Sequence, residues 1–352
     1  MFLVMRWVFG YTLNMFTDHD PSLSPENNRE NLRETEMIKL KEVQLDNNRF
    51  RPILTTHNPD PYASGAVEAV AAALQDCDVI GIESVGGDQE TRHEYEQAFT
   101  QLLAKQTVEV ESHREMIAMG LRLEHYNERN FSAGLWRELL GTDKVVTLLD
   151  MNSDDPHFSL FKESLSLDDE YEESVADLKL AAARDILRKN ITEVNRDAIR
   201  ARDAVIAGQI TQLSHTLDNK TVGIVLGALH YGALAPLYGD QADAKLSDIA
   251  RAVEPLTGLR LKNELEFRYM TTGHYDEPLA DRVLLSMIAA RQWTTAPLYA
   301  DPVIREISDE EVTSLLSQIE AVANKPMRTI YIGNILKRLE AKLVRPTIKT
   351  DF

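Results

Sequence analysis

The stretch Lys220–Gly232, KTVGIVLGALHYG, constrains the fold of this chain more than any other. Thr221–Leu226 is an apolar run rich in Val and Ile, and Gly227 ends it. Such a run is typical of a strand that is buried on both faces of a parallel sheet. Ligands of open parallel sheets bind at the carboxyl ends of the strands. His230 therefore either stands where such folds carry out chemistry or caps a core strand.

Three further apolar runs predict strands of the same sheet: Arg51–Thr56, Asp78–Ile82 and Lys144–Leu149. Between the first two, Ser64 can cap a helix over Gly65–Gln75, whose apolar residues recur at helical spacing. Strand, helix and strand in this order predict a βαβ unit with a right-handed crossover. We therefore expect an α/β fold with a central, mainly parallel sheet flanked by helices.

A polar residue follows each predicted strand, namely His57, Glu83, Asp150 and His230. Parallel strands place their carboxyl ends at one edge of the sheet, so these side chains should converge. Imidazoles and carboxylates are ligands for Zn²⁺, Mn²⁺, Fe²⁺ or Co²⁺, and a metal with an open position makes a hydroxide nucleophile near neutral pH. Each residue also has a structural interpretation: an Asx-Pro turn for His57, a helix N-terminus for Glu83, and a loop acid for Asp150.

The overall charge and the cysteine content exclude several functions. The formal net charge of −18 disfavours binding to DNA or RNA, which requires a basic surface. Cys77 is the only cysteine, so internal disulfides and thiolate-rich zinc sites are excluded. A metal in this protein would have to be held by His, Asp, Glu and water.

The pattern of residues predicts three regions. Residues 1–35 form an arm, with an apolar segment, Met1–Phe16, followed by a polar linker. The apolar segment is shorter than the roughly 20 residues that span a bilayer, and a packed strand or an interfacial anchor are alternatives for it. Residues 36–239 form the α/β domain, in which Phe161–Tyr171 is expected to be an acidic surface segment. Residues 240–352 are expected to be mostly helical, packed on that domain or acting as a dimerisation element. We expect a soluble, cytoplasmic protein without a transmembrane segment.

The order of these signals resembles the TraB and pheromone-shutdown family and its TIKI-type, ChaN-like and erythromycin-esterase-like relatives. The segments that carry the resemblance are LTTH at Leu54–His57, DVIGIES at Asp78–Ser84, KVVTLLD at Lys144–Asp150, RARDAVIAGQI at Arg200–Ile210 and VLGALHYGAL at Val225–Leu234. Leu54 departs from the pattern, because the family usually has a glycine there.

The resemblance implies a metal-dependent hydrolase that acts on a peptide or another acyl bond of a small substrate. His57, Glu83 and His230 would hold or surround a divalent metal with Asp150 nearby, and Glu83 could also act as a general base. Arg202 matches the arginine of the family and would face the substrate, whereas Arg196, Arg200 and Asp203 are expected to form ordinary ion pairs on a charged helix. Two alternatives remain: a non-catalytic haem- or metal-binding protein of the ChaN-like kind, and a regulatory or scaffold protein with a vestigial pocket.

Overall fold

The computed structural model describes residues 37–55, 65–83, 88–104, 135, 138–257, 260–292 and 300–343. His57 lies outside these residues. The chain divides into two compact units, and each is described by itself. The first unit contains Met1–Ser159 and Ile199–Leu256, and the second contains Leu160–Ala198 and Thr257–Phe352.

The first unit contains the predicted parallel sheet. Its described strands are β1 (Met37–Lys39), β2 (Val43–Leu45), β3 (Asn48–Thr55), β4 (Val79–Glu83), β5 (Val145–Leu149) and β6 (Thr221–Gly227). Strands β3, β6, β4 and β5 are parallel neighbours in that order, so the four predicted strands and their direction are confirmed. Strands β1 and β2 pair antiparallel with β3, an addition that the apolar pattern did not predict. Every residue of β6 before Gly227 is buried, as expected for a central strand.

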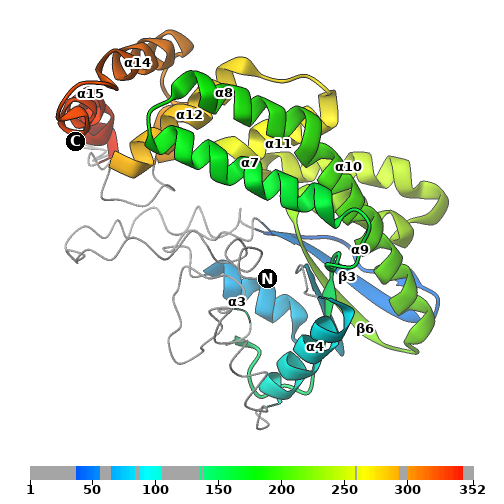
Figure 1. Ribbon diagram of the computed structural model, residues 1–352. Coiled ribbons are helices and arrows are strands. Elements are labelled where there is room, and N and C mark those ends of the chain that lie inside the picture. The colour runs from blue at the N-terminus through cyan, green and yellow to red at the C-terminus, as the bar shows by residue number, and fades with distance from the viewer. Residues whose placement is uncertain are drawn as a thin grey trace, which may run out of the picture. The chain divides into compact units, whose positions relative to one another are not determined.

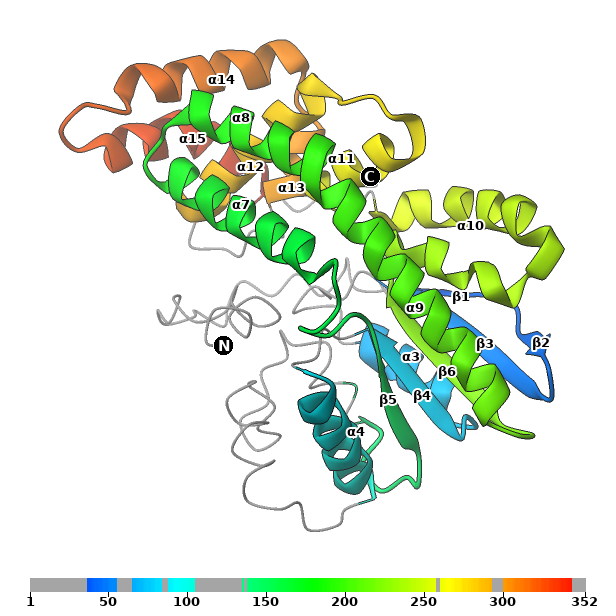
Figure 2. The same cartoon turned by 45° about the vertical axis from the view of Figure 1, so that its right-hand side comes forward.

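Helices cover the sheet of the first unit (Figure 1). They are α3 (Gly65–Leu74), α4 (Gln89–Leu103), α9 (Arg196–Thr216) and α10 (Ala242–Thr257), with the 3-10 segments η6 (Ala228–Leu237) and η7 (Gly239–Gln241) after β6. Apolar residues of α3 and α4 form one core with Ile53, Ile80, Val146 and Val225 of the sheet. A Cβ at Gly223 would clash with Leu74 of α3, so a glycine there lets the helix lie close to β6. Helix α9 lies across the other face (Figure 2).

Side chains of α4 satisfy the outer backbone groups of strand β5. Thr100 Oγ1 accepts from the Val146 N–H at 3.0 Å, and Glu96 Oε1 accepts from the Leu148 N–H at 2.8 Å. Arg92 donates to the carbonyl oxygens of Leu148 and Asp150. Because an open edge strand can pair with another chain, these bonds protect β5 and fix the backbone that leads to Asp150.

The second unit is helical. It contains α7 (Phe158–Ala176), α8 (Leu180–Lys189), the π-helical turn η5 (Asn190–Asn195), α11 (Leu261–Thr272), α12 (Glu277–Gln292), α13 (Ala300–Arg305), α14 (Asp309–Val322) and α15 (Arg328–Leu343). Helix α12 packs against α8, α11, α13, α14 and α15. The mainly helical C-terminal region is thus confirmed. Asn190 of η5 donates to Asp168 Oδ1 at 2.7 Å, which ties the π-helical turn to α7.

Two features of the second unit differ from the sequence-based expectation. Residues 161–171 do not form a surface segment, since they belong to α7 and Tyr171 is only 2% exposed. In addition, α7 and α8 share one hydrophobic core with the helices after residue 257, whereas we expected the helical region to begin at residue 240. The reason is that α8 packs against α12 and that Tyr171 and Val175 of α7 belong to the same apolar cluster, contacts that chain order does not reveal. In the part of the chain that is described, no helix is long and apolar enough to cross a membrane.

Candidate functional site

The register of the sheet brings the polar residues that follow the strands to one edge. Glu83, the last residue of β4, pairs with Leu149, the last residue of β5, and Asp150 comes next in the chain. Ile82 pairs with Val225 of β6, so the end of β6 and η6 lie at the same edge. This arrangement follows from parallel strands of matched length, which is why the sequence could predict it.

Glu83 is the centre of a buried cluster of charged groups. Its Oε2 accepts a 2.6 Å hydrogen bond from the backbone N–H of Gly227. Its Oε1 lies 3.3 Å from Nε2 of His230 and accepts from Arg202 Nη2 at 2.6 Å. The Glu83 side chain is only 12% exposed and that of His230 only 5%. The predicted convergence of Glu83 and His230 is therefore what the structure shows.

Arg202 of α9 joins Asp150 to Glu83. Its Nε lies 3.1 Å from each carboxylate oxygen of Asp150, and its Nη2 donates to both carboxylates. The Asp150 side chain is fully buried, and its Oδ1 also accepts from the Met151 N–H at 2.7 Å. The Gln209 amide, also on α9, bonds both the N–H and the C=O of Asp150, at 2.9 and 2.8 Å. The two carboxylates raise the pKa of Arg202 although burial opposes protonation, so it stays charged.

Asp203 orients the imidazole of His230. Asp203 Oδ1 lies 2.6 Å from His230 Nδ1, so the ring presents Nε2 to Glu83. Burial works against protonation of His230, but Glu83 and Asp203 outweigh it, and the pKa of the imidazole lies above its ordinary value. A Cβ at Gly232 would lie 2.6 Å from Asp203 Oδ2, so a glycine is required for Asp203 to reach the ring.

Among the described residues, carboxylates outnumber cations in this cluster. Glu83, Asp150 and Asp203 supply three carboxylates, and Arg202 supplies one guanidinium. Burial raises the pKa of Asp203, which favours its protonated form. A buried excess of negative charge stabilises an added cation or a proton.

Sequence reasoning found part of this site. Glu83 and His230 meet directly, and Asp150 reaches them through Arg202, whereas His57 is outside the described residues. Asp203 was expected to form an ordinary ion pair along its charged helix, and this was wrong, because its side chain is only 16% exposed and binds His230 of η6. The sequence did contain a sign of its burial. Asp203, Ile206 and Ile210 follow the i, i+3, i+7 spacing of one helix face, and both isoleucines are buried.

The donor set for a metal is incomplete within the described residues, which contain no group of three or more His, Cys, Asp or Glu side chains placed to hold an ion. Glu83 Oε1 and His230 Nε2 are nevertheless close enough to be two ligands of one ion. No family model, curated protein or solved structure matches this chain, so its kinship with the TraB and pheromone-shutdown proteins stays a prediction.

Proposed function

We propose that the cluster around Glu83 is the active site of a metal-dependent hydrolase that cleaves a peptide or another acyl bond. One observation carries the proposal: Glu83 Oε1 and His230 Nε2 lie 3.3 Å apart at the carboxyl edge of the parallel sheet, and Asp203 orients the imidazole. The resemblance to TraB-type and TIKI-type proteins supports the same reaction class.

The chemistry of the donors fits a divalent metal such as Zn, Mn, Co or Fe. Bonds of about 2.0–2.1 Å in a tetrahedral site place two ligand atoms roughly 3.3–3.4 Å apart, which agrees with the Glu83–His230 distance. Histidines that bind metals usually donate their other ring N–H to a carboxylate, as His230 does to Asp203. The excess negative charge of the cluster would also favour a cation.

Each residue of the cluster then has a role. Glu83 and His230 would hold the metal, which when bound supplies an acidified water. Arg202 would stabilise the negative oxygen that develops on the substrate carbonyl. Asp150 would hold Arg202 in place, since both of its oxygens contact the guanidinium. The backbone N–H of Gly227 fixes the carboxylate plane of Glu83.

Metal analysis of the full-length protein, purified without chelators, tests the proposal. We expect close to one first-row divalent metal per chain, little or none in Glu83→Gln and His230→Ala, and wild-type content in the control His215→Ala. The His215 side chain is 68% exposed and forms an ion pair with the exposed carboxylate of Asp46. Hydrolysis of fluorogenic peptides and simple esters should disappear with the metal and return when it is restored.

Three results would contradict the proposal. One is full metal content in a folded His230→Ala protein. Another is a Soret band with added haem together with no hydrolysis, which favours the carrier alternative. The third is a protein without metal or hydrolysis in which Glu83→Gln only lowers stability, because the cluster would then be a structural ion-pair network.

A further inference from the structure

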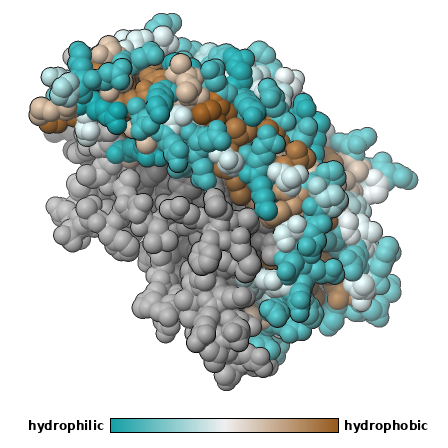
Figure 3. Space-filling view, in the orientation of Figure 1, coloured by the Kyte–Doolittle hydropathy of each residue, from teal (hydrophilic) through white to brown (hydrophobic). Residues whose placement is uncertain are grey.

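Exposed apolar side chains gather at the start of α15. Met327, Ile330 and Tyr331 are 68%, 54% and 47% exposed, and the only other exposed large apolar residue among those described is Val145 of β5. Ile330 and Tyr331 lie in the first turn of α15, and Met327 directly precedes the helix, with a positive φ of 62°. The helix face with Ile332, Leu336 and Leu339 is buried in the core of the second unit. Figure 3 shows apolar surface in the region where Figure 1 places α14 and α15.

The same segment has the opposite charge to the rest of the protein. Residues 325–352 contain seven Lys or Arg and two Asp or Glu, a net charge of +5 in a chain whose total is −18. Lys325 and Lys337 are exposed beside the apolar residues, and Arg328 is half-buried. We call Met327, Ile330 and Tyr331, with Lys325, Arg328 and Lys337, the α15 face.

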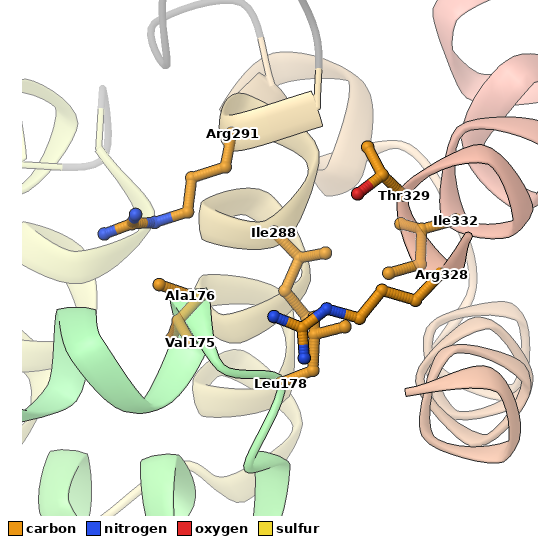
Figure 4. A pocket seen from close by; sticks show the side chains of 8 residues that line it. All are labelled: Val175, Ala176, Leu178, Ile288, Arg291, Arg328, Thr329 and Ile332. Carbon is orange, nitrogen blue, oxygen red and sulfur yellow. The ribbon is translucent and has the colours of Figure 1, made fainter. Parts of the chain in front are cut away.

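A pocket of about 170 Å³ adjoins the α15 face within the second unit. Its apolar walls include Leu178, Ile288 and Ile332, and Thr329 lies at its side. Arg291 of α12 and Arg328 of α15 both line the pocket; Arg328 extends toward Leu178, whereas Arg291 extends away from Arg328, past Ala176 (Figure 4). Arg291 lies 3.5 Å from Glu172, and Arg328 lies 3.4 Å from the Asp177 carbonyl oxygen. Two arginines above apolar walls suit a phosphate group that carries an apolar chain.

We propose that the α15 face docks on an anionic phospholipid surface. Met327, Ile330 and Tyr331 would enter the boundary between headgroups and acyl chains, and the basic residues and the arginine pocket would bind lipid phosphates. At ordinary salt, exposed charges more than about 10 Å apart are largely screened from each other. The acidic residues elsewhere in the chain therefore do not prevent the basic α15 face from contacting an anionic membrane.

Two other occupants fit the α15 face less well. A second copy paired about a twofold axis would bring the basic residues of both copies together, which is unfavourable. A nucleic acid would satisfy the basic residues but would leave the exposed Met and Ile side chains without an apolar environment.

Flotation of the full-length protein with vesicles tests the proposal. We expect binding to phosphatidylcholine vesicles that contain phosphatidylserine, at least roughly tenfold weaker binding to pure phosphatidylcholine, and loss of binding at high salt. Ile330→Ser combined with Tyr331→Ser should weaken binding about tenfold. Lys337→Gln should weaken it about fivefold, since one surface cation is worth about this factor. The matched controls are Val145→Ser and Arg251→Gln, which remove an exposed apolar residue and an exposed cation of the first unit.

Several outcomes would overturn the proposal. One is vesicle binding that does not depend on phosphatidylserine or on salt, or that Val145→Ser weakens as much as the α15 variants do. Another is a concentration-dependent dimer that Ile330→Ser dissociates. A third is tighter binding to single-stranded RNA than to vesicles. Competition by millimolar inorganic phosphate would assign the pocket to a free anion instead. A Tyr331→Trp reporter should shift its emission to the blue and be quenched by brominated acyl chains, and an unchanged spectrum would contradict insertion.

Discussion

Replacing Arg202 with Met tests whether the charged cluster is built as described. Arg202 contacts both the Glu83 and the Asp150 carboxylates, and both carboxylates are nearly or fully buried. At a separation of about 4 Å and an effective dielectric constant near 20, each pair is worth roughly 4 kcal/mol before desolvation is subtracted. Removing one partner of a buried ion pair costs about 3–5 kcal/mol. We therefore expect a loss of about 4 kcal/mol from Arg202→Met.

The assay should report on the first unit alone, because a protein of two units need not unfold in one step. Native-state hydrogen exchange of peptides from β4 and β6 gives that local free energy. The matched control is Arg200→Met, because Arg200 is exposed on the same helix and belongs to the first unit. The loss of this surface cation should change the free energy of unfolding by no more than about 0.5 kcal/mol.

A double-mutant cycle completes this test. Asp150→Asn removes a negative charge that Arg202 neutralises, so the double variant should be less destabilised than the sum of the single variants, with a coupling of about 1–3 kcal/mol. The reasoning fails if Arg202→Met costs no more than Arg200→Met, or if the two single losses simply add.

Two further predictions concern other contacts. Gly232→Ala should displace the Asp203 carboxylate from His230 and lower the free energy of unfolding by about 1–3 kcal/mol. The control Gly208→Ala should be neutral or slightly stabilising, because a Cβ there meets nothing within 4 Å. Chemical denaturation of both variants measures the difference. The bonds from Arg51 lower the pKa of Asp76 from 3.8 to about 2. A carboxyl with a depressed pKa stabilises the fold above its unfolded pKa, so this contribution should be lost as the pH falls from 3.8 to about 2. In Arg51→Met the NMR titration of Asp76 should return toward 3.8, and an unchanged midpoint would contradict the assignment.

The strands and their common edge could be predicted because they depend on local information. Val- and Ile-rich runs bounded by polar residues favour buried strands, and helix-length segments between them require parallel pairing. Once strands are parallel, residues just past their ends must share an edge. This is why Glu83 and His230 could be paired from sequence although their positions in the chain differ by 147.

The interactions inside the cluster were decided by tertiary packing. Arg196, Arg202 and Asp203 all occur on one charged helix, and only the orientation of α9 against the strand ends makes Arg202 and Asp203 buried partners while Arg196 stays at the surface. The antiparallel β1 and β2 likewise depend on the free edge of β3, which is absent from any local pattern.

The division into units shows the same contrast between sequence and tertiary structure. The sequence by itself determined the sheet, its direction and the helical character of the C-terminal region, because each follows from the spacing of apolar residues within a short window. Only the tertiary structure decided that α7 and α8 share a core with helices more than 70 residues later in the chain. The physical reason is that an apolar stripe specifies that a helix must be covered, but not which other helix covers it.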